Sequence, residues 1–343
     1  MSKIVFLYEV LKSPVLFLEQ LRVLNEANKY MKLIAVEALA PALSKLGVGG
    51  SVELNAFMEA EKFVDRSLLA ELLVLVEEEG IIKLEEEKIT LLKKPQQISL
   101  SEAMDKAHPL LREAFGTFME PTIRVIRERL SGKPARDFNS GDLRVHWSIA
   151  LEGKFYSIQR EKAIKFAKLV EEAKSRSGTF RILDYGCGGG AGTVQLYNSL
   201  SRAVEDFEVD GCDISEGLLE IAREEVAAGL PIHFFSLKKE KPKEGRYDAI
   251  FASHVLHWTD DPVRVIGELK SYLKPGGFIF GVESIISKRL YPIDLFIRIY
   301  GAKGFPSFKE LQRWFNENRM SLEYDPVWFS FKATPVQLNQ KQL

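Results

Sequence analysis

The chain has 343 residues, of which 46% are hydrophobic and 28% charged, and its formal net charge is −1. This length corresponds to about two domains of ordinary size, and the composition is typical of globular proteins with a sizeable core. The balanced charge gives the chain no overall attraction to nucleic acid or to an anionic membrane. Its two cysteines, Cys187 and Cys212, are too few for a disulfide framework and are compatible with a reducing compartment.

The first residues, MSKIVFLYEVLKSPVLFLEQLRVL, are apolar but interrupted by Lys3, Glu9, Lys12, Glu19 and Arg22. This pattern is typical of amphipathic helices, whereas a signal peptide has an unbroken apolar core. No later window approaches about 18 uncharged apolar residues, so no membrane span is predicted. We therefore expect a cytoplasmic protein without a membrane partner.

Residues 1–100 are predicted to form one mainly helical domain. In DRSLLAELLVLVEEEG the apolar residues recur at helical spacing, with Asp65 as the N-cap and Gly80 at the end. The preceding SVELNAFMEAE is predicted as a shorter helix opened by Ser51, and the following IIKLEEEKITLL as two strands around an acidic turn. Helices followed by a small hairpin are the element order of a winged helix.

A winged helix can bind DNA, but the charges of this segment argue against that function. The helix that would enter a groove carries one arginine against Asp65, Glu71 and Glu77–Glu79, and the hairpin carries Glu85–Glu87. DNA phosphates would be repelled by such surfaces, since affinity for DNA rests on Lys and Arg contacts. We expect no DNA binding and interpret the domain as a packing module.

Residues 101–174 are predicted as a helical linker or lid, interrupted at SGKPARDFNSGD, where turn-forming residues cluster. His146, Trp147 and Tyr156 lie in this segment and are candidates to cover a ligand. Packing in the core is the alternative role for Trp147.

Residues 175–343 show strands that alternate with helices. The predicted strands are RILDYG, FEVDGCDI, IHFFSL, YDAIFASHVL and FIFGVESII, and a helix within DPVRVIGELKSYL is ended by KPGG. Strands alternating with helices indicate parallel βαβ units and a doubly wound, Rossmann-like α/β sheet. The final MSLEYDPVWFSFKATPV is predicted as a closing pair of strands.

A glycine loop follows the first of these strands, in LDYGCGGGAG. Gly186, Gly188 and Gly190 give bare backbone N–H groups just before a helix, an arrangement that lets an extended polar ligand approach closely. With Ala191 the loop also fits the dinucleotide fingerprint, so the glycines alone do not choose between cofactors. A plain strand-to-helix turn is the alternative without a ligand.

Two aspartates help to decide which cofactor the glycine loop binds. Asp184 precedes the first glycine while still on the strand, where it would repel a pyrophosphate but balance a cationic ligand. Asp213 ends the second strand, where it can accept hydrogen bonds from two ribose hydroxyls. Its alternative role is capping of the next helix, shared with Ser215.

From Arg181 to about Ile285 the chain resembles class I S-adenosylmethionine-dependent methyltransferases. LDYGCGGGAG is similar to their first motif, VDGCDISEGLLEIARE to their second-strand segment, and ELKSYLKPGGFIFG to their helix, turn and fifth strand. The resemblance implies a seven-stranded sheet with S-adenosylmethionine as cofactor, and domain bounds of 175–343 for the part that binds it. Its methionine end would lie against the glycines and Asp184, and its ribose against Asp213. Adenine would lie near Ile214 and the end of the third strand, where Ser236 and Leu237 stand in place of the aspartate that the family often has.

The front half resembles the N-terminal dimerisation domain of the small-molecule O-methyltransferases. The similarity covers about Met31–Leu92, LSGKPARDF and the helical linker. It implies a homodimer whose N-terminal helices close over the substrate, with apolar residues of MSKIVFLYEVLKSPVLFLEQL in the subunit interface. It also implies that the helix with Leu295, Phe296, Ile299 and Tyr300 lies over an apolar acceptor, although packing in the core explains these residues equally well.

His257 is the candidate general base. It lies just past the carboxyl end of the fourth predicted strand, the edge where ligands bind in such sheets, and an ordinary imidazole accepts protons near neutral pH. In the O-methyltransferase family a histidine followed by Asp and Trp holds this place, whereas here Trp258 follows directly. A packed or capping role for His257 therefore stays open. Ser253 and His254 are candidates to line the cofactor pocket.

Two absences limit the function further. No N-P-P-Y-type tetrapeptide follows the fourth strand, which argues against amino-methylation of nucleic-acid bases, and no Cys or His cluster has the spacing of metal ligands. The sequence thus predicts a methyltransferase acting on a small molecule, with O-methylation favoured. The alternatives are a methyltransferase for RNA or protein and a non-catalytic S-adenosylmethionine-binding regulator.

Overall fold

The computed structural model describes residues 14–96, 100–135 and 142–336. The contacts between Cα atoms divide the chain into two compact units. The unit that we call the helical unit comprises Leu18–Asp137 and Ser287–Ala302, and the unit that we call the sheet unit comprises Met1–Phe17, Phe138–Ile286 and Lys303–Leu343.

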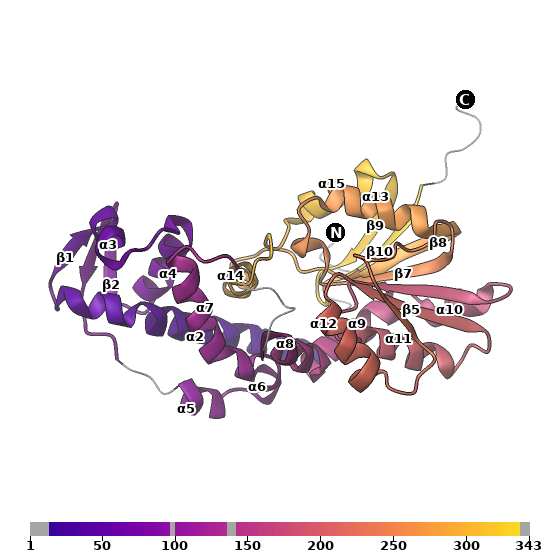
Figure 1. Ribbon diagram of the computed structural model, residues 1–343, viewed down its shortest axis with the longest axis horizontal. Coiled ribbons are helices and arrows are strands. Elements are labelled where there is room, and N and C mark those ends of the chain that lie inside the picture. The colour runs from indigo at the N-terminus through magenta and orange to yellow at the C-terminus, as the bar shows by residue number, and fades with distance from the viewer. Residues whose placement is uncertain (1–13, 97–99, 136–141, 337–343) are drawn as a thin grey trace. The chain divides into compact units, whose positions relative to one another are not determined.

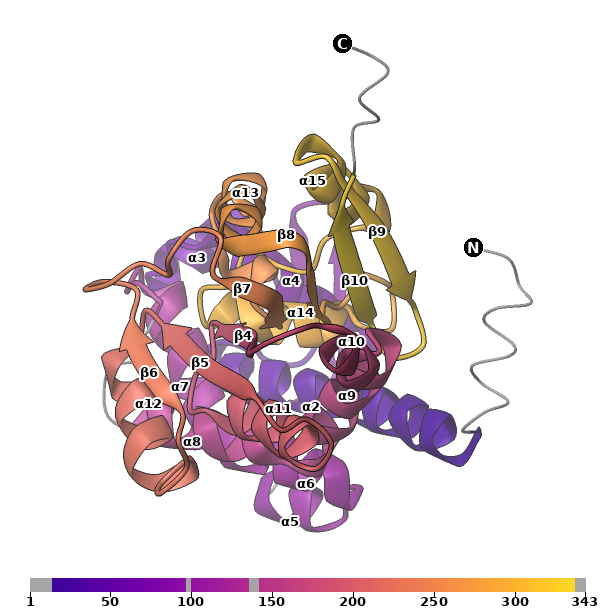
Figure 2. The ribbon, with the colours of Figure 1, turned by 90° about the vertical axis from the view of Figure 1, so that its right-hand side faces the viewer.

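A seven-stranded sheet forms the centre of the sheet unit, in the order β6–β5–β4–β7–β8–β10–β9. Five neighbouring strands, from β6 to β8, run parallel, and β10 is antiparallel to both β8 and β9. Figure 2 shows β6 and β9 at the opposite edges. The strands are β4 (Phe180–Tyr185), β5 (Phe207–Asp213), β6 (His233–Ser236), β7 (Tyr247–Ser253), β8 (Leu273–Val282), β9 (Met320–Asp325) and β10 (Ser330–Pro335). The prediction of a Rossmann-like seven-stranded sheet is therefore confirmed.

Helices cover both faces of this sheet because successive residues of each strand point to opposite sides. Ile182 of β4 packs into a buried cluster with residues of α9, α10 and α11, whereas Leu183 packs into one with residues of α13 and α15. Figure 1 shows the same two helical layers. The helices are α8 (Asp142–Glu152), α9 (Lys154–Phe166), α10 (Leu169–Ser175), α11 (Ala191–Ser201), α12 (Glu216–Ile221), α13 (Pro262–Tyr272) and α15 (Phe308–Glu317).

The start of β8 differs from the prediction. KPGG was expected as a turn that ends α13, but it belongs to the strand, which begins at Leu273. Leu273 pairs with Tyr247, and the ladder resumes when Phe278 pairs with Ala249. Between these two pairs β8 has four residues and β7 only one, so β8 carries three extra residues, as in a β-bulge. The glycines therefore lie within the strand and do not end it.

The helical unit contains a three-stranded antiparallel sheet in the order β1–β3–β2. As predicted, Asp65 caps a helix, accepting a hydrogen bond from the Leu68 amide at 3.0 Å. The predicted helix from Ser51 is wrong at its start, because Ser51–Glu53 pair with β3 and the helix begins only at Leu54. The elements are α2 (Pro14–Leu43), β1 (Ser51–Glu53), α3 (Leu54–Glu61), α4 (Arg66–Glu78), β2 (Ile82–Glu85), β3 (Lys88–Leu91), α5 (Leu100–Asp105), α6 (Pro109–Phe115), α7 (Met119–Leu130) and α14 (Tyr291–Ile299).

The division into units differs from the predicted boundaries at residues 100 and 174. Helices α5 to α7 belong to the helical unit, whereas α8 to α10 belong to the sheet unit, where α9 buries Ala163 and Ile164 in the sheet's core. The segment Ser287–Ala302 returns to the helical unit, although the sequence on both sides of it belongs to the sheet unit. Its helix α14 is held there because Arg298 and Tyr291 both bond to Glu71 of α4, each at 2.8 Å.

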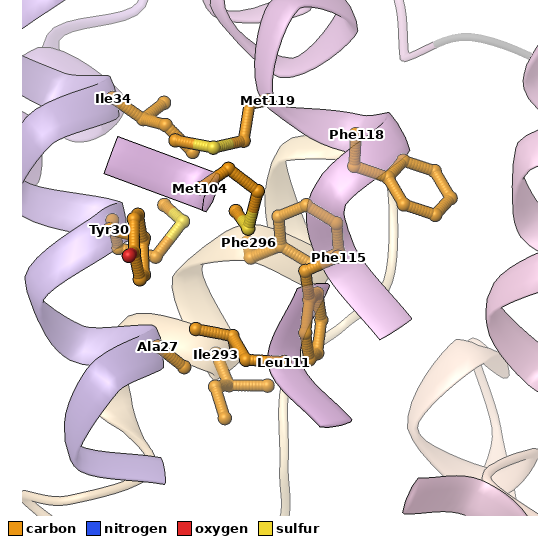
Figure 3. A pocket seen from close by; sticks show the side chains of 11 residues that line it. Ala27, Tyr30, Ile34, Met104, Leu111, Phe115, Phe118, Met119, Ile293 and Phe296 are labelled. Atoms are coloured by element: carbon orange, nitrogen blue, oxygen red, sulfur yellow. The ribbon is translucent and has the colours of Figure 1, made fainter. Parts of the chain in front are cut away.

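An apolar pocket lies within the helical unit (Figure 3). Side chains from several helices line it, among them Tyr30 and Ile34 of α2, Phe115 of α6 and Phe296 of α14. Leu295, Ile299 and Tyr300 are buried beside Phe296. Packing in the core of the helical unit thus accounts for the four apolar residues that the sequence offered as an acceptor-binding face.

Within the described ranges, no helix combines the length and the apolar character needed to cross a membrane. The segment MSKIVFLYEVLKSPVLFLEQL, offered above as a subunit interface, lies for the most part outside those ranges.

Candidate active site

The glycine loop lies between β4 and α11 at the carboxyl edge of the parallel strands. The amides of Gly186 and Cys187 both donate to the carbonyl oxygen of Cys212, at 2.8 and 3.0 Å, which fixes the loop against the end of β5. Gly186 and Gly190 have φ angles of 73° and 86°, values that side chains disfavour. A Cβ at Gly186 would lie 2.6 Å from Val255 Cγ2. Glycine is therefore required there for both backbone conformation and space.

Asp213 ends β5 and faces the loop. Its Oδ2 accepts from the amide of Gly188 at 2.9 Å, and its Oδ1 accepts from the amide of Ser215 at 2.8 Å. Ser215 itself caps α12 through the Leu218 amide, so the capping role belongs to Ser215. Burial raises the pKa of Asp213, and three backbone hydrogen bonds partly offset that rise. Because each carboxylate oxygen has two acceptor sites, Asp213 can still accept from a pair of hydroxyls.

The residues expected near an adenine lie beside Asp213. Ser236 pairs with Asp213 across β5 and β6, and the amide of Leu237 donates to the Asp213 carbonyl at 2.9 Å. Ser236 is buried. Ile214, the next residue after Asp213, is 62% exposed. An apolar side chain left open beside a buried carboxylate provides a surface for a flat, largely apolar ring.

Asp184 lies near the end of β4 and is buried. Its Oδ2 accepts a hydrogen bond from the hydroxyl of Thr193, on α11, at 2.7 Å. Burial raises the pKa of Asp184 to about 7, against the opposing effects of the Thr193 bond and the positive charge of Arg160, while the charge of Asp213 adds to the rise. A cation bound beside Asp184 would stabilise its ionised form.

A pocket joins Asp184, Arg160 of α9 and the glycine loop. Ser253 and His254, which follow the same edge on β7, line the pocket too. The sequence pattern did not identify Arg160, because it lies on α9, well before the motif in the chain. Thr193 was not identified either, although it directly follows the glycine loop and was therefore a usable signal. The pocket brings together Asp184, the loop and the end of β7, and Asp213 holds the loop from the other side.

His257 lies in the short helical turn η4 (Leu256–Trp258), after β7. The His257 side chain is buried, and its Nδ1 is 2.6 Å from Oε1 of Glu283, a fully buried residue just after β8. The other oxygen of Glu283 accepts from the amide of Leu256 at 3.2 Å. A carboxylate only accepts hydrogen bonds, so Nδ1 carries the hydrogen and Nε2 is left to accept a proton. Sequence reasoning missed Glu283, although an acidic residue at the carboxyl end of the neighbouring strand was a usable signal.

His254 differs from His257 in its contacts and in its pKa. Its Nε2 lies 3.1 Å from Oε1 of Gln159, and its φ of 56° is unusual for a residue other than glycine. Burial lowers the pKa of His254 to about 3, and the nearby His257 and Arg160 add to that effect. His254 is therefore neutral at physiological pH. Its ring lies edge-on to those of Tyr156 at 5.5 Å and His257 at 6.1 Å, so it connects the pocket to His257.

Aromatic rings also pack against His257. Phe305 meets the imidazole edge-on at 5.1 Å, and the Trp258 ring lies 5.8 Å from it. Trp147 of α8 packs against Trp258 in turn, at 5.8 Å. Of the predicted lid residues, Trp147 and Tyr156 thus reach this region through ring contacts, and His146 lies on the same helix as Trp147. Such a shell excludes water from the imidazole.

No metal centre is evident in the described part of the chain, where no group of three or more His, Cys, Asp or Glu side chains is placed to hold an ion. Cys187 and Cys212 are buried and unpaired, and burial raises the pKa of both thiols well above the ordinary value. Neither is suited to act as a nucleophile, because the reactive form is the thiolate.

Comparison with known proteins agrees with this geometry. Residues 183–279 match the model of a family described as a methyltransferase domain. The malonyl-[acyl-carrier protein] O-methyltransferase of Halalkalibacterium halodurans is 31% identical over 129 residues, which are 36% of this chain and 46% of that protein. The ubiquinone biosynthesis O-methyltransferase of Proteus mirabilis is 28% identical over 216 residues, 54% of this chain and 81% of that protein. The chain thus spans less than half the length of the first of these relatives.

A solved structure shares the fold over almost the whole chain. The DszA carbon methyltransferase superposes with a TM-score of 0.67, covering 98% of this chain and 94% of that one at 16% identity. Such identity speaks for the fold alone. The shared fold, the family match over residues 183–279, the sheet order and the glycine loop together show that the chain contains a methyltransferase domain built on a Rossmann-like, seven-stranded sheet.

Proposed function

We propose that this chain is an S-adenosylmethionine-dependent methyltransferase that acts on a small molecule, with an oxygen acceptor favoured. One observation carries the proposal: the carboxyl edge of the parallel sheet holds Asp184, the glycine loop and Asp213, and His254 links that pocket to the buried His257–Glu283 pair. The names of the two bacterial relatives, both O-methyltransferases, support the choice of oxygen.

The residues present fit this cofactor. Asp213 has acceptor capacity left for a ribose diol, and the exposed Ile214 offers an apolar surface for adenine. Asp184 is a buried carboxylate suited to the ammonium group of the methionine end. A dinucleotide fits less well, because its pyrophosphate would have to approach Asp184.

The bound cofactor would supply a methyl group activated by a sulfonium. The chain's own contribution is to orient the acceptor, exclude water and remove a proton. If the acceptor is a hydroxyl, Nε2 of His257 would take up its proton as the methyl group that the bound cofactor supplies is transferred to the acceptor oxygen. Glu283 holds the imidazole in the required tautomer and stabilises the positive charge that forms, as a triad aspartate does.

Substitution of the pair tests this assignment. His257→Gln and Glu283→Gln should each lower kcat by about 10²- to 10⁴-fold for the acceptor that is turned over, with the affinity for S-adenosylmethionine unchanged. His233→Gln is the matched control, since His233 is exposed on β6. A simple catechol and a malonyl thioester serve as first acceptors. Turnover at the normal rate in His257→Gln would contradict the base.

A carbon acceptor next to a carbonyl group is the second candidate. The fully buried Glu283 behind His257 favours it, because removal of a proton from carbon benefits from an imidazole whose charged form is stabilised. A β-keto thioester tests it: mass spectrometry of the product would locate the new methyl group on carbon or on oxygen.

The helical unit supports a further part of the proposal, a winged-helix-like module that forms a homodimer. Its order of helix, strand, two helices and two strands is that of a winged helix. Several apolar side chains are exposed on it: Leu18, Val48, Val64 and Leu92. The exposed Glu85–Glu87 oppose DNA as a partner. Sedimentation at micromolar concentration should give the mass of two chains, and a monomer would remove this role.

The same proposal places the protein in the cytoplasm. Its two unpaired, buried cysteines suit a reducing compartment. Fractionation of the native host followed by immunoblotting tests the location, and recovery outside the cytoplasmic fraction would contradict it.

A further inference from the structure

The pair formed by His257 and Glu283 places a negative charge in the interior of the sheet unit. The side chain of Glu283 is 0% exposed and that of His257 3% exposed. Both oxygens of Glu283 lie opposite N–H groups, Oε1 at 2.6 Å from Nδ1 of His257 and Oε2 at 3.2 Å from the amide of Leu256. An ionised carboxylate accepts hydrogen bonds in this way. With a neutral imidazole, the form that can act as a base, the pair carries one net negative charge.

The neighbouring cations do not neutralise this charge. Within residues 14–96, 100–135 and 142–336, the ion-pair partner of Glu283 is His257, and no lysine or arginine lies within ion-pair distance of it. The amide of Lys303 donates to the His257 carbonyl at 2.7 Å, but the Lys303 ammonium pairs with the exposed Asp260. Arg160 lines the pocket at the glycine loop instead. The charge of Glu283 therefore acts on whatever binds at the imidazole.

An acceptor bound to Nε2 of His257 would feel that charge strongly. The rings of Phe305 and Trp258 pack against the imidazole, so little water screens the interaction. The acceptor atom would lie about 7 Å from the Glu283 carboxylate, separated from it by the imidazole and two hydrogen bonds. For a negatively charged acceptor, repulsion at this distance corresponds to a loss of about 10- to 100-fold.

The chemistry of the pair leads to the same distinction between acceptors. A carboxylic acid is ionised at neutral pH, so a carboxylate acceptor has no proton for His257 to remove and gains nothing from a base. A hydroxyl group, or a carbon atom next to a carbonyl group, arrives uncharged and still carries its proton. Only acceptors of this second kind both escape the repulsion and use the base.

We propose that the buried charge of Glu283 makes the site selective for acceptor groups that are uncharged and still carry their proton, and excludes carboxylates. The inference rests on the proposed function, which requires only that a methyl group is transferred to a small molecule. It adds the chemical class of the acceptor and assigns the selection to Glu283.

Two matched pairs of acceptors test the selection at neutral pH: catechol with benzoate, and an acetoacetyl thioester with a malonyl thioester. Mass spectrometry separates methyl esters from ethers and from C-methyl products. The wild type should methylate the uncharged acceptor of at least one pair with a kcat/KM at least about 10-fold above that for the methyl ester of its partner.

Glu283→Gln should change the two classes of acceptor in opposite directions. Turnover of the uncharged acceptor should fall by about 10²- to 10⁴-fold, whereas kcat/KM for methyl ester formation should rise by about 10- to 100-fold, because the repulsion is gone. Asp260→Asn is the matched control. It removes the same charge from a side chain that is 88% exposed, and its selectivity should equal that of the wild type.

A merely structural role of Glu283 would give a different result, since Glu283→Gln would then lower both activities, which would overturn the inference. Should Glu283→Gln fail to fold, inhibition of the wild type by benzoate and by uncharged benzamide measures the same repulsion. Benzamide should inhibit about 10- to 100-fold more strongly, and equal inhibition would overturn the inference. Methyl esters formed by the wild type as fast as the other products would overturn it as well. If the wild type methylated none of the four acceptors, the proposed function itself would be overturned.

Discussion

Asp184 is the residue whose protonation the site depends on most directly. In the free protein burial holds its pKa at about 7, far above the ordinary value of 3.8. The folded state therefore keeps a proton on Asp184 that the unfolded chain has lost between about pH 4 and pH 7. This contribution to stability is complete below pH 4 and is lost as the pH rises through 7. Binding of a cationic ligand has the opposite pH dependence, because it requires the carboxylate.

We predict that the affinity for S-adenosylmethionine rises between pH 5 and pH 7, by at most about tenfold per pH unit, and levels off above 7. The other titratable groups around Asp184 are Arg160, Asp213, Cys187 and His254. Burial keeps the pKa of Arg160 near 10, raises that of Cys187 far above its usual range and lowers that of His254 to about 3, so these three do not titrate in this interval.

Asp213 is the remaining group whose pKa is raised, and Asp184→Asn distinguishes the two. Calorimetry from pH 5 to pH 7 should show a steep rise in affinity for the wild type and a nearly flat profile for the weaker-binding variant. An equally steep profile in Asp184→Asn would assign the titration to another group.

The sequence was most informative about residues next to each other in the chain. Asp184, the glycines and Asp213 follow directly from strand ends in the one-dimensional pattern, and the structure places them at one edge. Glu283 was missed because it meets His257 across two strands and 26 positions of sequence. Arg160 was missed because the sequence of an amphipathic helix does not show whether one of its arginines is buried or exposed to solvent.

At the scale of elements, the helix α14 shows what holds a segment in the helical unit. Phe296 is buried, and its ring contacts those of Phe115 and Phe118, both edge-on at 5.6 Å, and that of Tyr300 at 5.1 Å. We predict that Phe296→Ala lowers the free energy of unfolding by about 3–5 kcal/mol, because it removes these contacts and leaves a cavity.

Phe308→Ala is the matched control for that prediction, since Phe308 is 44% exposed at the start of α15. Its cost should be about 1 kcal/mol or less. Urea denaturation followed by circular dichroism measures both changes. A loss below about 1 kcal/mol for Phe296→Ala would show that α14 contributes little to the stability of the unit.

The elements with strong periodicity were predictable, and those that depend on a partner strand were not. The helix after Asp65 and the closing strand pair β9 and β10 agree with their patterns. Local sequence predicts a helix for Ser51–Glu53, because only pairing with β3 makes them a strand. Local sequence likewise predicts a turn at KPGG, since Leu273 becomes part of β8 only through its pairing with Tyr247.

At the scale of the whole molecule, the sequence predicts two kinds of architecture in the right order but not the division between them. Domains predicted from the order of elements along the chain are contiguous. The segment Ser287–Ala302 instead belongs to the helical unit, although the sequence before and after it belongs to the sheet unit. The apolar pattern of this segment does not specify which core it joins. Its partner is identified by three-dimensional contacts, namely those of Arg298 and Tyr291 with Glu71 and those of Phe296 with Phe115 and Phe118.

The central claim is that the glycine loop and its two aspartates bind S-adenosylmethionine. The most direct test is a calorimetric titration of the full chain with S-adenosylmethionine and, separately, with a reduced nicotinamide dinucleotide. The account predicts one site per chain for S-adenosylmethionine, lost in Asp184→Ala and in Asp213→Ala while both variants stay folded, and no heat with the dinucleotide. Binding of the dinucleotide alone, or unchanged affinity for S-adenosylmethionine in both variants, would contradict it.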